Sequence, residues 1–263
     1  MKPYDKTIRK VNDVLTGEYL EAKNLSERIA AEMEPPRFYL EKKREIVTSR
    51  WLFTDAPMVK AGLKIVEDRA DRIGHGLSHV RKVAVEAGAI VIIELNGTTS
   101  KEDVERKVLL AHLAGILHDI KRKEPEHAKR GAEEAGRILE KFDLEERERL
   151  GIVEAIGNHE AFKPARPLDD PSLQIISDAL YDADKFRWGP DNFTETVWMM
   201  VAPRKIPIPS LLKRFDGSLK GIERIKDTFR TPTGREYGPD FICRGLEIGK
   251  RVYEALERIY GSK

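Results

Sequence analysis

The chain has 263 residues with a formal net charge of +2, and 35% of its residues are charged. That length suffices for a sizeable core in one large domain or two small ones, and the interspersed charges exclude the basic tract typical of polyanion-binding proteins. Cys243, the only cysteine, excludes an intramolecular disulfide, and the lack of a signal stretch or bilayer-length apolar run leads us to expect a cytoplasmic protein without a membrane partner.

The first part of the chain predicts helices separated by prolines. Residues 5–31 carry apolar side chains at helical spacing, and Pro35 with Pro36 ends the pattern. A second helix is expected over about residues 38–53. Pro57, a residue type favoured at the first helical position, opens a third helix that continues to about residue 66.

The stretch Gly74-His75-Gly76 marks the opening of the next helix, which is predicted over residues 77–87. The following run, residues 89–95, is rich in branched side chains that favour a strand. Because an isolated strand would have nothing to pair with, we interpret the run as a helix end or an irregular segment. Ser100 and Asp103 form an N-cap pair for the helix after it.

The rest of the chain predicts further helices between proline-rich loops. Helical patterns cover residues 128–142, 143–157 and 173–185, and two C-terminal helices follow, the last over 241–260. The expected class is therefore all-α. We expect one globular unit with an N-terminal helical arm (1–71), a core (72–200) and a C-terminal helical extension (201–263).

The adjacent pair His118-Asp119 follows an apolar run, residues 108–117. Polar groups at the end of a buried helix are costly unless they are paired or bind a metal. The chain has six histidines, and all except His112 stand in a local context that suits a ligand, whereas His112 is interpreted as a core or helix-surface residue. Imidazole and carboxylate are ligands of Zn, Mn, Fe, Co and Ni, so the sequence predicts a divalent-metal site.

The order His79, His118-Asp119 and Asp184, on successive predicted helices, resembles the HD-domain superfamily of metal-dependent phosphohydrolases. The resemblance covers about residues 72–187 and includes Asn158-His159-Glu160, where relatives often have His-His-Glu. It implies an HD-domain-like helical bundle and a metal held by four residues, His79, His118, Asp119 and Asp184. Because Asp182 neighbours the last of these ligands, we expect it to orient a ligand histidine.

Three further histidines leave alternatives open. His75 lies four residues before His79 and is the alternative first ligand, or a substrate-binding group. The resemblance implies that His127 and His159 complete a second metal position. The alternative is a single ion, with both histidines contacting the substrate phosphate. We therefore expect one or two divalent ions, drawn from Mn, Fe, Co, Ni, Zn and Mg.

Hydrolysis of a phosphoester requires activated water, cations for the phosphate oxygens and a proton for the leaving group. Asp119, Arg122 and Glu124 are the candidate catalytic residues, and Glu126 and Glu160 are alternative proton donors. The candidate substrate-binding residues are His75, Lys121, Arg122, Lys185 and Arg187.

The sequence leaves more than one interpretation open for two later segments. Residues 188–193 are interpreted as a rigid loop packed on the core, with an aromatic wall for a substrate base as the alternative. Four cations of the C-terminal part are candidates to reach a phosphate, and the sequence does not choose among them: Lys205, Arg214, Arg230 and Arg235.

The expected function is hydrolysis of a phosphomonoester or nucleotide by metal-activated water, with a small phosphorylated molecule as partner. The helices outside the core are expected to shape the pocket mouth or to form a homodimer contact. Two alternatives remain open. One is a two-iron oxygenase of the HD type, which six candidate ligands permit, and the other is a nucleotide-binding sensor without turnover.

Overall fold

The computed structural model describes residues 15, 17–69 and 75–261. These residues form helices joined by turns, and no strand occurs among them, which confirms the predicted all-α class. The helices of the first half are α2 (Glu18–Ala31), α3 (Arg37–Glu41), α4 (Lys43–Asp55), α5 (Pro57–Arg69), α6 (His75–Glu94) and α7 (Lys101–Leu117). The second half contains α8 (His127–Leu139), α9 (Glu146–Gly157), η1 (Pro171–Leu173), α10 (Gln174–Phe186), η2 (Asn192–Thr196), α11 (Val197–Val201), α12 (Ile208–Leu212), α13 (Phe215–Glu223), η3 (Arg224–Asp227) and α14 (Pro232–Tyr260).

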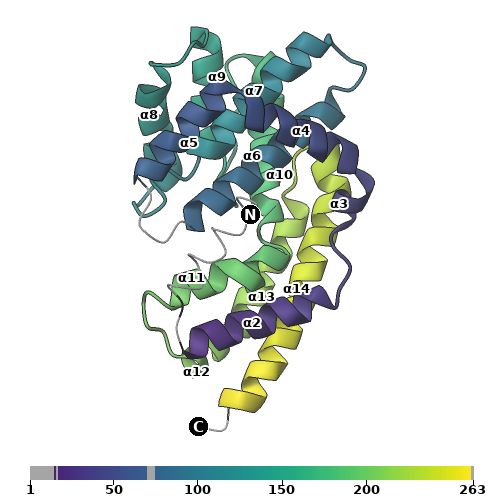
Figure 1. The fold of residues 1–263 in the computed structure, drawn as a ribbon, viewed down its shortest axis with the longest axis vertical. Helices are drawn as coiled ribbons and strands as arrows, with labels where there is room; N and C mark the ends of the chain where they lie inside the picture. Colours follow the sequence, from purple (N-terminus) through teal and green to yellow (C-terminus); the bar gives the residue numbers. More distant parts are fainter. Residues whose placement is uncertain (1–14, 16, 70–74, 262–263) are drawn as a thin grey trace.

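Helices α6, α7 and α10 pack against one another at the centre of the larger part of the molecule (Figure 1). Their sequences explain this place, because residues 83–91 of α6, 110–117 of α7 and 179–186 of α10 are buried on every side. A helix that is buried all round belongs in a core. Helices α8 and α9 pack together beside them, and α4 and α5 cover α6 and α7.

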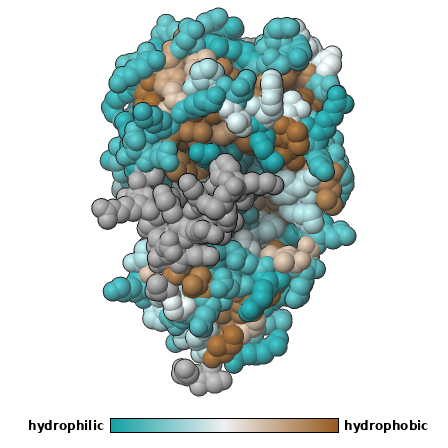
Figure 2. Space-filling model, viewed as in Figure 1, coloured by the Kyte–Doolittle hydropathy of each residue, from teal (hydrophilic) through white to brown (hydrophobic). Residues whose placement is uncertain are grey.

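The long helix α14 joins this larger part to a smaller one. It contacts α10 and α6, and further along it contacts α13, α12 and α2 (Figure 1). The segment before α6 is therefore divided, since α2 packs on the C-terminal helices while α4 and α5 pack on the core. None of the described helices is long and apolar enough to cross a bilayer, and hydrophilic residues make up most of the coloured surface in Figure 2.

Several predicted boundaries are confirmed. Ser100 caps α7 by accepting a hydrogen bond from the backbone N–H of Asp103 at 3.1 Å. Pro57 is the first residue of α5, and α9 and α10 lie where the pattern places them. The predicted helix over residues 5–31 is seen as α2 alone, because residues 1–14 and 16 lie outside the described part.

Other boundaries differ from the prediction. The expected helix over residues 38–53 is two helices that meet at Lys42, whose φ and ψ of −108° and 27° leave the helical region. Helix α6 extends beyond the predicted residue 87 to Glu94, because Ala89, Ile90 and Val91 are buried in the core, and this confirms the interpretation of the apolar run as a helix end. Three α-helices and the short 3₁₀ helix η3, rather than two helices, follow Pro207, and the last α-helix begins at Pro232.

The early start of α14 has a cost, because Pro239 lies inside it. A proline within a helix removes one backbone hydrogen bond and costs about 3 kcal/mol. The helix continues because the residues around the proline bury a large apolar face, including Tyr237, Phe241 and Ile242.

Candidate metal centre

Three polar side chains from the central helices meet at one point. His79 lies on α6, His118 follows the last residue of α7, and Asp184 lies on α10. The Nε2 atoms of His79 and His118 are 3.2 Å apart. Asp184 Oδ1 is 3.4 Å from the first nitrogen and 3.6 Å from the second. This first group confirms that the tertiary fold gathers residues more than 100 positions apart in the sequence.

A second group of three lies next to the first. Asp119, His127 and His159 each offer one ligand atom, and these atoms lie within 4.8 Å of one another. Asp119 also lies close to the histidines of the first group. Its Oδ2 is 3.5 Å from Nε2 of both His79 and His118, whereas its Oδ1 is 3.8 Å from Nε2 of His159. The Asp119 carboxylate therefore presents one oxygen to each group.

Local backbone structure places the ligands of the second group. Helix α7 ends directly before His118, so the chain turns at Asp119. His127 is the first residue of α8, and Glu126 before it has a φ of 52° and ψ of 40°. This left-handed conformation is uncommon for a residue other than glycine, and it redirects the chain from the turn into α8. His159 follows the end of α9 by two residues.

Backbone carbonyls fix the protonation of two of the histidines. His118 Nδ1 donates to the carbonyl oxygen of Gly115 at 2.8 Å, and His159 Nδ1 donates to that of Ile156 at 2.6 Å. A carbonyl can only accept, so in the neutral ring the proton lies on Nδ1 and the Nε2 lone pair is bare. Both bare Nε2 atoms are directed at the carboxylates, which is the orientation of a metal ligand.

The donor set fits a divalent cation. The Nε2 atoms of His79 and His118, which are 3.2 Å apart, form a pair of nitrogens that a shared cation would hold together. The two aspartates supply negative charge to the same point. Nitrogen and oxygen ligands of this mixture suit Zn, Mn, Fe, Co and Ni. The residues present therefore fit the metal that the sequence predicts.

Burial and charge set the pKa values of these groups in opposite directions. Burial lowers the pKa of His79, and it lowers that of His159 to about 4, so both rings are neutral at pH 7. Burial also acts to lower the pKa of His118, but the carboxylates of Asp119 and Asp184 outweigh it and raise the pKa. Positive charge is thus favoured where the carboxylates converge.

Both aspartates are held ionised. Burial acts to raise the pKa of Asp119, but the charges of His118 and Arg122 outweigh it and hold the pKa below its usual range. The pKa of Asp184 is likewise held well below its usual range, since Lys185 and the ligand histidines outweigh burial. Ionised carboxylates are the form that binds metal.

Two of the predicted substrate-binding cations lie at the centre. Arg122 Nη1 pairs with Asp119 Oδ2, and Lys185 Nζ lies 2.5 Å from Asp184 Oδ2. Lys185 is buried, whereas the Arg122 side chain is 54% exposed. His118 is fully buried and His127 is 29% exposed, so the centre is closed at the first group and open to solvent at Arg122 and His127.

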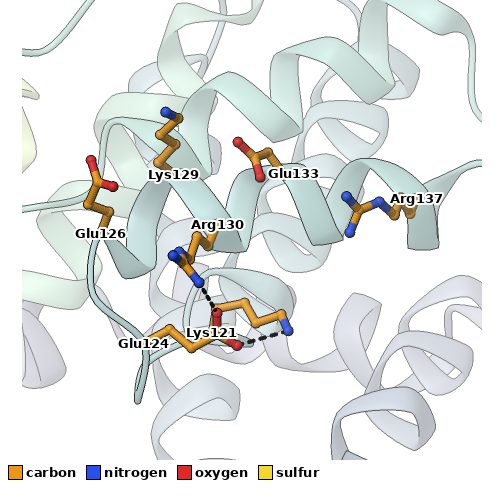
Figure 3. Close-up of a pocket in the computed structure, with 7 residues that line it drawn as sticks. All are labelled: Lys121, Glu124, Glu126, Lys129, Arg130, Glu133 and Arg137. Atoms are coloured by element: carbon orange, nitrogen blue, oxygen red, sulfur yellow. Dashed lines mark hydrogen bonds and ion pairs between the residues drawn. The ribbon is translucent and has the colours of Figure 1, made fainter.

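The predicted residues Lys121 and Glu124 line a neighbouring surface pocket of about 360 Å³. Lys121 and Arg130 both pair with the Glu124 carboxylate, at 3.0 and 2.9 Å (Figure 3). The other lining residues are Glu126, Lys129, Glu133 and Arg137. None of the six candidate ligand residues lines this pocket. Because the Glu124 carboxylate is paired with two surface cations there, its environment does not favour it as the proton donor.

Among the three acids proposed as proton donor, Glu160 has the closest link to the ligands. Its Oε1 lies 3.8 Å from Nδ1 of His127, and its side chain is partly exposed. Glu126 precedes His127 but its carboxylate lines the surface pocket of Figure 3. The structure therefore favours Glu160 over Glu124 and Glu126.

Arg187 and Asp182 have other partners than those predicted. Arg187 is buried and donates to Glu86 Oε2 at 2.5 Å and to the Tyr39 hydroxyl at 2.8 Å, which favours a structural role over a substrate contact. The expectation that Asp182 orients a ligand histidine is not met. Both of its oxygens accept hydrogen bonds from residues 230 and 231, and backbone carbonyls hold His118 and His159 instead.

His75 begins α6, but its side chain lies outside the described part of the chain. His112 is a fully buried core residue whose Nε2 lies 2.9 Å from Ser49 Oγ. Residues 188–193 pack on the core through the buried Phe193, as predicted, but residues 190–193 are helical and do not form a loop.

Sequence reasoning missed one structural requirement of the centre, the close crossing of α6 and α7. A Cβ atom on Gly115 would lie 2.6 Å from Ala84 Cα, so only glycine permits this approach. The crossing lies one turn before His118 and brings α6, with His79, against α7. A lone glycine in an apolar run carries no sequence signal for this contact.

Comparisons of the chain with protein-family models, with curated proteins and with solved structures give no match.

Proposed function

We propose that the chain is a metal-dependent phosphohydrolase with a site of the HD-domain type, acting on a phosphomonoester or nucleotide. The observation that supports it most is the position of Asp119, whose two oxygens face two adjacent groups of nitrogen and oxygen ligands. Six residues of the predicted order take part: His79, His118, Asp119, His127, His159 and Asp184.

These residues would hold a divalent metal, and the chemistry that it would supply is a lowered pKa of coordinated water, which gives a nucleophile at neutral pH. The chain's own residues prepare the site for this. The carbonyls of Gly115 and Ile156 hold the proton of the neutral His118 and His159 rings on Nδ1, which leaves Nε2 as the ligand atom. Asp119 and Asp184 stay ionised because of their cationic neighbours.

The same residues suit a phosphate substrate. Arg122, at the open side of the centre, is bound by one carboxylate oxygen and is half-exposed, so its remaining donors can take phosphate oxygens. Lys185 supplies a second, buried positive charge beside Asp184. Glu160, next to His127, is the acid placed to protonate a leaving alkoxide.

A two-iron oxygenase remains the alternative, because the same six ligands form two adjacent groups of three. Metal analysis separates the two functions. Protein purified without chelators is to be measured for metal content, then assayed with Mn, Co, Ni, Mg and Zn on a panel of nucleotides and sugar phosphates. Release of inorganic phosphate supports the proposal, whereas two irons per chain with oxygen uptake supports the oxygenase.

His118→Ala and His112→Ala provide the matched pair for this assay. Each variant removes a buried histidine: His112 lies within α7, and His118 directly follows it. Only His118 belongs to a candidate ligand group. The proposal requires that His118→Ala loses metal and turnover while His112→Ala keeps both. Absence of phosphate release with every metal tested, from folded wild-type protein, would overturn it.

A further inference from the structure

The loop that follows α9 carries a ligand histidine and is tied together at its two ends. Asn158, directly before the ligand His159, donates a side-chain hydrogen bond to the carbonyl oxygen of Arg166 at 2.8 Å and accepts one from the Arg166 backbone N–H at 3.0 Å. The Asn158 carbonyl oxygen accepts a third bond, from Arg230 Nη2 at 2.9 Å. These contacts fix both ends of the segment 159–165, so its residues have defined positions relative to His159.

Phe162, within this loop, has an unusual backbone conformation. Its φ is 61°, and among the described residues only two others besides glycines have a positive φ, Glu126 and Lys205. A bulky side chain in the left-handed region is strained. Glu126 directly precedes the ligand His127, and Phe162 follows the ligand His159 by three positions. Two of these three residues therefore lie next to ligands of the second group.

Burial of the Phe162 ring does not compensate for the strain, because the residue is 49% exposed. The guanidinium of Arg224, on η3, lies over the ring with its Cζ 4.6 Å from the centroid. Such a contact contributes little at an exposed site. Strained conformations without a gain from packing are found mostly at functional sites. The exposed ring is also accessible to a planar ligand.

The loop places this ring close to the metal centre. Glu160, in the same loop, has its Oε1 3.8 Å from Nδ1 of His127. Two residues of chain span at most about 7 Å and three at most about 11 Å, so the Cα of Phe162 lies within these distances of the Cα atoms of Glu160 and His159. A nucleotide separates its phosphate from its base by one sugar, which is a length of this order.

The aromatic residues that the sequence offered as a wall for a substrate base are less accessible. Phe193 is buried, and Trp188 packs on the core. Of these three aromatic residues, Phe162 alone is exposed, and it belongs to the same loop as a candidate ligand.

We propose that Phe162 is a substrate-binding residue whose ring stacks on the base of a nucleotide while the phosphate of that nucleotide lies at the metal centre. Every base has a π face, so stacking of this kind tolerates different bases. Arg224 supports the ring and supplies a cation beside the ligand. This inference rests on the proposed function for the position of the phosphate, and it narrows the substrate class from phosphomonoesters in general to nucleotides.

The test measures binding to Mn-loaded protein by titration calorimetry, with two probes that lack a phosphate. Adenosine carries a base, whereas ribose carries none. Phe162→Leu removes the aromatic face and keeps an apolar side chain, and Phe162→Trp keeps an aromatic face. Leu150→Ala is the control, because it truncates another large apolar side chain, on α9, that is 45% exposed. Urea unfolding of each variant shows whether the fold is retained.

We expect the wild type to bind adenosine more tightly than ribose, and Phe162→Leu to weaken adenosine binding by about 5- to 100-fold, the usual effect of losing an aromatic stacking partner. Phe162→Trp is expected to keep the affinity, and Leu150→Ala to bind as the wild type does. The inference is overturned if the wild type binds adenosine no more tightly than ribose. It is also overturned if Phe162→Leu leaves the adenosine affinity unchanged, or if Leu150→Ala lowers it equally.

Kinetics separate this inference from the proposed function. With AMP and ribose 5-phosphate as substrates, Phe162→Leu should raise the KM for AMP about 5-fold or more and leave that for ribose 5-phosphate unchanged. If the wild type hydrolyses both and neither KM changes in Phe162→Leu, the inference fails while the proposed function holds. If the wild type hydrolyses neither but binds adenosine through Phe162, the proposed function fails and the stacking site holds.

Discussion

Asp119 is the residue on which the geometry of the centre depends most. Its neighbours His118 and His159 have their protons fixed on Nδ1 by backbone carbonyls, so both present Nε2 toward it. Its two oxygens lie 3.5 Å from one of these nitrogens and 3.8 Å from the other. Replacement of this carboxylate affects both ligand groups, which makes it the most informative single change.

Asp119→Ala is expected to abolish turnover and to lower the metal content of both groups. Outer partners of metal ligands typically contribute 10- to 100-fold in affinity, so removal of a charged ligand should weaken metal binding by at least about 100-fold. Elemental analysis of protein purified without chelators, together with the phosphate-release assay, measures both effects. Full metal content in a folded Asp119→Ala protein would contradict the assignment.

His112 provides the contrast, a buried histidine without a place in the centre. His112→Ala deletes a fully buried ring that packs edge to face on Phe53. Such truncations cost roughly 2–5 kcal/mol, so the free energy of unfolding in urea should fall by that amount. Turnover per folded molecule and metal content should stay within about twofold of the wild type.

The pH dependence of stability tests the same residue. Burial lowers the pKa of His112 to about 3 from an unfolded value of 6.5, so below pH 6.5 the unfolded chain binds a proton that the folded chain does not. Stability then falls as the pH drops from 6.5 toward 3, by about 1.4 kcal/mol per pH unit. Between pH 7 and pH 5 the stability difference between wild type and His112→Ala should shrink by about 2 kcal/mol. A difference that is constant over this range would contradict the buried, neutral ring.

At the scale of the helices, the contact between α6 and α7 decides whether the first ligand group forms. His79 lies on the first helix and His118 follows the second, and the two helices meet closely at Ala84 and Gly115. The separation of the two imidazoles therefore depends on a glycine that carries no chemical function.

Gly115→Ala is expected to force the two helices apart, because the added Cβ would lie 2.6 Å from the Ala84 backbone. Overpacking of this kind costs about 1–3 kcal/mol, and metal affinity should fall with it. Gly62→Ala on α5 is the control, since its Cβ would meet Ile116 and Leu113 of α7 at an ordinary 3.6 Å. The control should change stability by less than about 1 kcal/mol and leave metal binding unchanged.

At the scale of the whole molecule, a buried polar network links the core to the segments around it. Arg187, three residues after Asp184, binds Glu86 of α6 and Tyr39 of α3, and Asp191 pairs with the same guanidinium. Lys82 extends the network, since its ammonium lies 3.0 Å from both Asp191 and Glu195. These ion pairs and hydrogen bonds therefore hold segments that are distant in the sequence together beside helices α6 and α10.

Arg187→Met is expected to destabilise the protein by about 3–5 kcal/mol, because it leaves Glu86 buried without its partner. The double variant Glu86→Leu, Arg187→Met should recover part of this loss, since no unpaired charge then remains. Urea unfolding gives both values. An unchanged stability with a raised KM in the single variant would restore Arg187 as a substrate residue.

The sequence by itself determined the helical class, most helix positions and the six candidate ligands. These features are local: apolar spacing, caps, prolines and short motifs are set by residues close together in the chain. The ends of helices were predicted less well, as at Lys42 and Pro232, because burial of an apolar face by distant helices outweighs local preferences.

Only the tertiary structure decided which polar residues share an environment. It placed Glu160 beside His127, committed Arg187 to Glu86, and joined Asp182 to the segment that carries Arg230. Each of the last two contacts spans more than 40 residues, and even Glu160 meets His127 only because α8 packs on α9. Hydrogen bonds and ion pairs depend on distances of a few ångströms, and the spacing of residues in one sequence does not specify such distances across a fold.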